Sequence, residues 1–338
     1  MPIDSAPAHP LSDSTPPQAL RGRAVIVAVA LLCGMAVSGA FAADTVRQGK
    51  AVPNSFAFGI AEVGIQSKIF AQEGIDLEVS SFRGDAQMQQ ALTSGAIDVG
   101  FGSGPAMGFH AKNVPAVAVA ALYGRPQNLA LVVPEKSPIK GAADLKGKRV
   151  GVTTLGSLTD WLVRETSRQQ GWGSDGIVVM PLGSMQARLA AVDRGELDAL
   201  ILEAASGYQL QDDGKAKPVL FFGDLVRDFY THVIFATDDM VQKRPDVLRR
   251  YLRGIFKTVA FMKANKDFTV KSEAKTIEVS EAVAAKVYDV QLSAFSTDGS
   301  FDPKAIEVIR RSLKELGILD FEPDPKTLYN DTFVPVKF

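Results

Sequence analysis

The chain has 338 residues, of which 46% are hydrophobic and 22% are charged, a composition typical of a globular protein of one or two domains. Its 37 basic and 38 acidic residues leave a formal net charge of -1 without a basic stripe, which argues against nucleic acid as a partner. Because a nearly neutral protein gains little from long-range steering, any charged ligand must be recognised by local groups.

The N-terminal segment is typical of a secretory signal peptide. Arg21 and Arg23 precede an apolar run at residues 24–37, and Ala40-Phe41-Ala42 matches an A-x-A cleavage site. The run is shorter than the ~20 residues that a spanning helix needs. We therefore expect residues 1–42 to be a signal peptide, cleavage after Ala42 and a periplasmic location; an uncleaved membrane anchor is the alternative.

Beyond this segment, short apolar runs alternate with longer periodic ones, which predicts an α/β protein with a helical C-terminal region. Strands are expected at residues 76–82, 99–101, 117–122, 128–133, 149–152, 177–180, 199–202, 218–222 and 233–236. Helices are expected at residues 87–94, 157–170, 245–263 and 280–295, and a last one begins at Asp302-Pro303. The prolines of residues 134–138 predict a linker.

Residues 91–99 (ALTSGAIDV) are echoed by residues 191–199 (AVDRGELDA). Each copy predicts a helix end, a glycine stop, and an aspartate entering a buried strand, and the continued register sets Ser103 opposite Glu203. We infer two similar α/β lobes, the first from residues 43–134 plus 234–338 and the second from residues 135–233. Chance similarity is the alternative for so short a match.

Catalytic and metal-binding patterns are not found in the sequence. The only cysteine, Cys33, lies in the signal segment, so the mature chain would have no thiolate, disulfide or cysteine-bound metal. Of three histidines, His9 lies in the same segment, and His110 and His232 are too far apart in sequence to predict a metal cluster. We expect no catalytic residue, no metal and no cofactor.

Three small polar turns follow predicted strands, and they contain Ser55 and Phe56, Ser103 and Gly104, and Thr154, Gly156 and Ser157. Ligands of open α/β sheets bind outside the carboxyl ends of the strands. Helix starts at such turns offer free amides and partial positive charge, so they can bind anions without lysine or arginine. The turns therefore predict a site for a singly charged anion, with plain helix capping as the alternative and Arg83 or Arg125 as basic groups that could reach it.

Two further places are candidates for ligand contacts. Glu203, at a strand end, can accept from a ligand amine or hydroxyl, or pair with Arg125 between lobes. Tyr230 and His232 precede the strand at residues 233–236 and are expected to line the cleft near the hinge, although an ordinary buried or surface histidine is the alternative for His232.

Several segments resemble one protein family: GIQSKIFAQEGI at residues 64–75, MQQALTSGAIDVG at 88–100, DLKGKRVG at 144–151, GELDAL at 195–200 and KRPDV at 243–247. Over residues 45–270 the chain resembles the nitrate, sulfonate, taurine and thiamine-precursor group of periplasmic binding proteins of ABC importers. Residues 46–52 depart from the family pattern, because Gln48-Gly49-Lys50 predicts a poor strand core.

The resemblance implies a type II periplasmic binding protein fold, in which two α/β lobes joined by two crossover strands close over a ligand. We place the hinge near residues 131–134 and 232–236. The contacts implied are Ser55, Phe56, Ser103, Gly104, Thr154, Gly156, Ser157 and Glu203. The implied function is that of a monomeric solute-binding component that hands a small polar or anionic solute to the permease of an ABC importer.

Two other functions remain alternatives. A periplasmic ligand sensor would use the same fold to dock a receptor in place of an importer. An enzyme of this fold is less favoured for two reasons. A related pyrimidine synthase type uses a cysteine-rich motif, whereas the mature chain would have no cysteine. That synthase and a related dehydratase work in the cytoplasm, whereas this chain has a predicted export signal.

Overall fold

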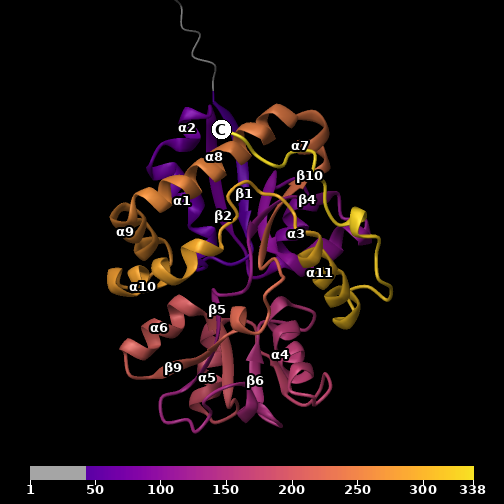
Figure 1. The fold of residues 1–338 in the computed structure, drawn as a ribbon. Helices are drawn as coiled ribbons and strands as arrows, with labels where there is room; N and C mark the ends of the chain where they lie inside the picture. Colours follow the sequence, from indigo (N-terminus) through magenta and orange to yellow (C-terminus); the bar gives the residue numbers. More distant parts are fainter. Residues whose placement is uncertain (1–42) are drawn as a thin grey trace, which may run out of the picture. The chain divides into compact units, whose positions relative to one another are not determined.

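Two five-stranded mixed sheets flanked by helices make up residues 43–338, the part of the chain that the computed structural model describes (Figure 1). The first sheet has the order β2-β1-β3-β10-β4 and the second the order β7-β6-β8-β5-β9. The strands are β1 (Asp44–Lys50), β2 (Ile75–Ser81), β3 (Val99–Ser103), β4 (Ala116–Tyr123), β5 (Leu129–Pro134), β6 (Arg149–Val152), β7 (Val178–Pro181), β8 (Ala199–Glu203), β9 (Ala216–Phe221) and β10 (His232–Thr237). The predicted α/β class is confirmed.

The helices are α1 (Ile60–Gln66), α2 (Ile69–Gln72), α3 (Asp85–Thr93), α4 (Leu158–Gln169), α5 (Met185–Asp193), α6 (Ala204–Asp212), α7 (Asp238–Lys243), α8 (Pro245–Ala264), α9 (Lys266–Thr276), α10 (Glu281–Gln291) and α11 (Pro303–Glu315). Each predicted helix has a counterpart among them, and the chain after β10 is mostly helical, as expected. Pro245 begins α8, whose apolar face is buried against α1 and α2.

The internal echo is confirmed as a repeated backbone unit. Gly95 and Gly195 end their helices with φ angles of 69° and 71°, a left-handed conformation that glycine adopts without a steric penalty. Ala91 O then accepts from Ala96 N at 2.9 Å, and Ala191 O accepts from Glu196 N at 2.8 Å. The same unit therefore leads into β3 in the first sheet and into β8 in the second.

Each copy of the unit is fastened by an arginine–aspartate pair. Arg47 on β1 donates from Nη2 to Asp98 at 2.6 Å and from its backbone amide at 2.9 Å. Arg149 on β6 donates from Nε to Asp198 at 3.0 Å and from its backbone amide at 2.8 Å. Because each pair ties the entry of one strand to its parallel neighbour, the two sheets share one local architecture.

Strand β1 corrects an expectation drawn from its polar residues. It lies between β2 and β3 in the first sheet, although Gln48-Gly49-Lys50 was expected to make a poor strand core. Tyr251 donates its hydroxyl to Gln48 Oε1 at 2.7 Å, and the ammonium of Lys50 pairs with Glu62. Buried polar groups are tolerated when they are hydrogen-bonded, and here α1 and α8 supply the partners.

The predicted lobe boundary and hinge are also corrected. Residues 129–134, placed in the first lobe, form β5, which pairs with β8 and β9 of the second sheet. The expected hinges at residues 131–134 and 232–236 lie inside β5 and β10, where each residue is paired with at least one neighbouring strand. The chain instead crosses between the sheets at residues 124–128 and 225–231.

The two crossing segments are hydrogen-bonded to each other. Thr231 donates its backbone amide to Gly124 O at 2.8 Å and its hydroxyl to the same oxygen at 2.6 Å. These two hydrogen bonds to one carbonyl oxygen fix where the segments meet.

The predicted signal peptide, with Cys33, His9 and the cleavage site after Ala42, lies outside the described residues. Among residues 43–338, no helix has the length and apolar character required to span a bilayer.

The arginine–aspartate pairs predict a stability change with a defined pH dependence. Although burial alone would raise the pKa of Asp98, hydrogen bonds from Arg47 hold that pKa below its usual value. The carboxylate therefore stabilises the fold at neutral pH, and this contribution is lost as the pH falls through the pKa of the folded state. We expect Asp98→Asn to lower the unfolding free energy at pH 7 by about 1 kcal/mol, since Arg47 is partly exposed.

Urea unfolding at pH 7 and pH 3 measures this effect, which should shrink at the lower pH. Asp198→Asn should cost less than Asp98→Asn, because the side chain of Asp198 is 29% exposed and that of Asp98 only 14%. Asp239→Asn, at an exposed position, is the control. If Asp98→Asn lowers the unfolding free energy equally at both pH values, the electrostatic explanation is contradicted.

Candidate functional site

Five polar side chains gather where the carboxyl ends of the central strands meet the crossing segments: Ser55, Asn128, Arg188, Glu203 and His232. We call this set the junction cluster. Three of its members were predicted from the sequence, whereas Asn128 and Arg188 were not.

Asn128, fully buried in the first crossing segment, connects the two sheets. Its Nδ2 donates to Glu203 Oε2 at 3.2 Å and lies 3.0 Å from His232 Nε2. Since Nδ2 is a donor, His232 Nε2 is the acceptor, and the proton of the neutral ring resides on Nδ1. The end of β8 and the start of β10 are thus joined through one amide group.

Burial sets the protonation states of Glu203 and His232. Burial raises the pKa of Glu203 to about 8, although Asn128, Ser55 and Arg188 all act to lower it. Burial also lowers the pKa of His232 to about 3, and its ring packs 4.3 Å from that of Phe58. At neutral pH, Glu203 is therefore mostly a neutral carboxylic acid and His232 a neutral imidazole.

Arg188 is the charged member of the cluster. It lies on α5, is 6% exposed, and donates from Nη1 to Ile201 O and from Nε to Ser184 O at 3.4 Å. Burial lowers its pKa to about 10, opposed by Glu203, so the guanidinium remains charged at neutral pH. The internal echo contained the signal for it: extended toward the N-terminus, the same register sets Arg188 opposite Met88.

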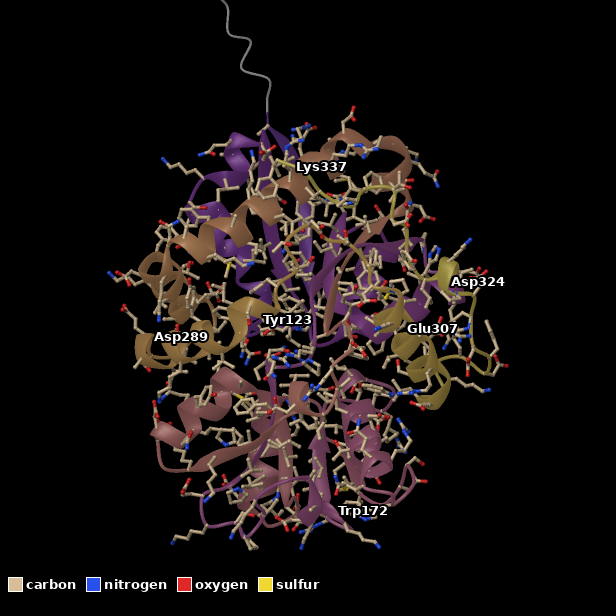
Figure 2. The ribbon with its side chains drawn as sticks, viewed as in Figure 1. Tyr123, Trp172, Asp289, Glu307, Asp324 and Lys337 are labelled. Carbon is tan, nitrogen blue, oxygen red and sulfur yellow. The ribbon has the colours of Figure 1, made fainter. Side chains whose placement is uncertain are left out.

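Tyr123 and Phe56 form part of the apolar surroundings. Tyr123, labelled in Figure 2, ends β4 with its ring 6.0 Å from that of His232, and its hydroxyl donates to Gln291 O at 3.2 Å. Phe56, predicted as a ligand contact, is fully buried next to Phe295, with ring centroids 6.1 Å apart. Ser55 directly precedes it and is itself buried.

The turn after β3 is occupied by contacts within the first sheet. Ser103 donates its hydroxyl to Asp85 Oδ2 at 2.8 Å and its amide to Oδ1 at 2.9 Å. Gly104 lies so close to the carbonyl of Tyr230 that a side chain there would overlap it. The hydroxyl of Tyr230 accepts from the amide of Asp302, which turns it toward the C-terminal region.

The turn after β6 forms the predicted capping arrangement. Ser157 Oγ accepts from Asp160 N at 3.3 Å and from Thr153 Oγ1 at 3.0 Å, while Asp160 Oδ2 accepts from Gly156 N at 2.8 Å. Thr154 is exposed. No hydrogen bond within residues 43–338 connects this turn to the junction cluster, so its geometry agrees with the capping alternative.

Helices of the two sheets also contact one another beside the cluster. On α4, Trp161 Nε1 and Arg168 Nη2 donate to Glu315 Oε2 of α11 at 2.9 Å and 2.7 Å. Lys286 of α10 pairs with Asp212 of α6 at 3.0 Å. These contacts flank the crossing segments with ion pairs.

Two cavities in the described part lie elsewhere. One of about 460 Å³ is lined by residues that include His110, Asp238, Lys326 and Tyr329, and one of about 230 Å³ lies between α11 and Glu322. Neither is lined by a member of the junction cluster. Across residues 43–338, no group of three or more histidine, cysteine, aspartate or glutamate side chains is arranged to hold a metal ion.

Solved structures resemble this one over most of their length. The alkanesulfonate-binding protein SsuA from Xanthomonas axonopodis pv. citri, bound to MOPS, is 18% identical with a TM-score of 0.70, over 83% of this chain and 95% of that one. The periplasmic aliphatic sulphonate binding protein SsuA from Escherichia coli is 21% identical with a TM-score of 0.71, over 85% and 92% of the two chains.

An enzyme shares the fold as well. DSZB, a desulfurization enzyme, in complex with biphenyl-2-sulfinic acid is 19% identical with a TM-score of 0.64, over 86% of this chain and 97% of that one. At these identities the likeness shows the fold alone, which confirms the expected periplasmic binding protein fold.

A search of curated proteins finds no match. The model of the NMT1/THI5-like family, in contrast, matches residues 63–267, more than half of the chain. That match spans β2 to β10 and both copies of the repeated unit. The chain therefore belongs to the NMT1/THI5-like family.

Proposed function

We propose that this protein is the periplasmic solute-binding component of an ABC-type importer and captures a small polar or anionic organic solute. The observation that carries the proposal is the junction cluster, a set of buried polar groups shared between two similar α/β units. Sulfonates, taurine, nitrate, aromatic acids and pyrimidine precursors are the candidate solutes.

Unused hydrogen-bonding capacity in the cluster supports a ligand site. Asn128 Oδ1 is buried without a hydrogen-bond partner, and Ser55 Oγ and His232 Nδ1 interact only weakly, with Glu203 and with the backbone of Gly102. Each unsatisfied buried polar group costs about 1–3 kcal/mol, and such groups are uncommon in folded proteins. A polar solute bound here would supply partners to side chains of the first sheet and of the crossing segment, next to Glu203 of the second sheet. Binding would therefore favour the close approach of the two sheets.

In this proposal the two sheets with their helices are lobes, and residues 124–128 and 225–231 are the hinge between them. The ion pairs from α4 to α11 and from α6 to α10 then belong to the closed arrangement. Closure over the solute would present both lobes of a monomer to the permease in the inner membrane. Residues 1–42 would direct export and be removed after Ala42.

A thermal-shift screen of the chain from Ala43 onward tests the proposal. The panel contains taurine, ethanesulfonate, MOPS, nitrate, benzoate and a 4-aminopyrimidine, each followed by calorimetry where a shift appears. A solute at one hundred times its dissociation constant should stabilise the protein by about 2.7 kcal/mol. Mass spectrometry of the recovered solute should find it unchanged.

Conversion of the solute to a product would show an enzyme of this fold. Absence of binding across the panel would contradict the proposed solute class. A ligand sensor would be favoured if the protein binds a solute but cells do not need the protein to take that solute up.

Glu203 provides a prediction that needs no ligand. Because its pKa rises to about 8 in the fold, the folded state holds a proton that the unfolded chain releases near pH 4.5. This group therefore makes the unfolding free energy fall as the pH rises from about 4.5 to 8. We expect Glu203→Gln to remove that slope, so that it stabilises the protein relative to wild type by a few kcal/mol more at pH 8 than at pH 5.

Urea unfolding at several pH values measures the difference between variant and wild type. Subtracting the unfolding free energy of wild type from that of the variant cancels the contribution of His232. That contribution makes the unfolding free energy rise with pH between about pH 3 and 6.5. Glu135→Gln, at an exposed position, is the control. A difference that does not change with pH would show that Glu203 is ionised in the folded protein.

A further inference from the structure

We infer that Arg188 is the counter-charge of the bound solute and restricts this site to singly charged oxyanions such as carboxylates, sulfonates or nitrate. The inference rests on the proposed function, which it makes specific in one residue and one ligand class.

The position of Arg188 places its charge at the carboxyl edge of the second sheet. Its Cγ and Cδ pass over Gly151 of β6, each 3.4 Å from the point that a Cβ there would occupy, which is ordinary packing contact. The guanidinium then reaches Ile201 O, two residues before Glu203 at the end of β8. Ligands of α/β folds bind at this edge.

Arg188 has no carboxylate partner. None of the ion pairs formed within residues 43–338 includes it, and the carbonyl oxygens that it contacts satisfy hydrogen bonds but do not balance a charge. Glu203 is the acid whose field reaches it, and burial keeps that acid mostly protonated at neutral pH. A buried charge is costly unless it is paired, so a bound anion would remove a penalty that the empty protein carries.

The repeated unit shows that the fold itself does not require an arginine here. In the first copy the equivalent position is Met88, which packs against Gly49 and Gly100. In the second copy Arg188 takes the corresponding path over Gly151. Two copies of one architecture thus differ by one buried positive charge, and structural need alone does not account for the difference.

The remaining groups of the cluster bring no balancing charge at neutral pH. His232 is neutral, and Ser55 and Asn128 are uncharged. The net charge of the cluster is therefore +1, which a monoanion neutralises. A guanidinium also presents a planar fork of donors that matches trigonal oxyanions.

The test compares Arg188→Met, the residue of the first copy, with Arg188→Lys and the control Arg194→Met, which removes an exposed charge from the end of the same helix. Calorimetry at fixed ionic strength measures binding of acetate, methanesulfonate, benzoate and nitrate, with sulfate as a dianion and choline as a cation. We expect wild type to bind a monoanion in preference to sulfate and choline. Arg188→Met should weaken that binding about 10- to 100-fold, a loss of the size expected for charge-assisted hydrogen bonds.

Stability without ligand separates this role from a structural one. Arg188→Met should unfold at the same or a higher temperature than wild type, because a methionine fills the equivalent site of the first copy. Arg194→Met should bind within twofold of wild type, and Arg188→Lys should retain more binding than Arg188→Met. If Arg188→Met does not fold, Arg188→Gln replaces it, and equal binding by the Lys and Gln variants overturns the inference.

The outcomes also separate this inference from the proposed function. If wild type binds a monoanion and Arg188→Met binds it within threefold, the role of Arg188 is wrong while solute binding stands. If wild type binds only neutral, cationic or doubly charged solutes, the ligand class is wrong and solute binding again stands. If wild type binds nothing in this panel or in the wider screen, the proposed function fails and the inference fails with it.

Discussion

The hydrogen bonds of one buried amide, that of Asn128, hold the polar ends of the two sheets together. Its nitrogen contacts Glu203 on β8 and His232 on β10 at once, and both Asn128 and His232 are buried. Buried polar groups must find partners within the protein, so this contact fixes a neutral imidazole on His232. Burial keeps the carboxyl of Glu203 protonated, against the opposing effect of the Asn128 hydrogen bond. The protonation states, the approach of the sheet edges and the isolation of the Arg188 charge all follow from that burial.

The repeat explains the architecture, and the departures from it explain the site. Arg47–Asp98 and Arg149–Asp198 build the same strand entry twice, so the two sheets have corresponding strand orders. The copies diverge at the carboxyl edges of the sheets. Ser103 of the first copy occupies the position equivalent to Glu203 of the second, and Met88 the position equivalent to Arg188. A symmetrical framework therefore presents unlike chemistry from its two halves, which suits the recognition of a solute with one charged end.

Local sequence signals predicted most elements, and long-range pairing explains the failures. Glycine stops, caps and apolar runs located the strands and the repeated unit, because these signals act over a few residues. The apolar run that forms β5 is the same whichever sheet it joins, so the boundary and hinge were misplaced. Gln48 and Lys50 looked unsuited to a central strand because their partners, Tyr251 on α8 and Glu62 on α1, lie outside the strand and become neighbours only in the fold. Arg188 was not predicted, because no local pattern marks an arginine that only the tertiary fold buries.

One consequence concerns the mechanics of the connection between the sheets. Both bonds from Thr231 end on the carbonyl oxygen of Gly124, and two more bonds join the same connections, from Gly223 N to Pro126 O at 3.0 Å and from Gln127 Nε2 to Asp224 Oδ1 at 3.1 Å. Two unlinked strands would allow the halves to slide past one another as well as turn. If the two sheets belong to moving lobes, as proposed above, these bonds between the segments would resist shear and leave rotation about the crossing segments as the easier motion.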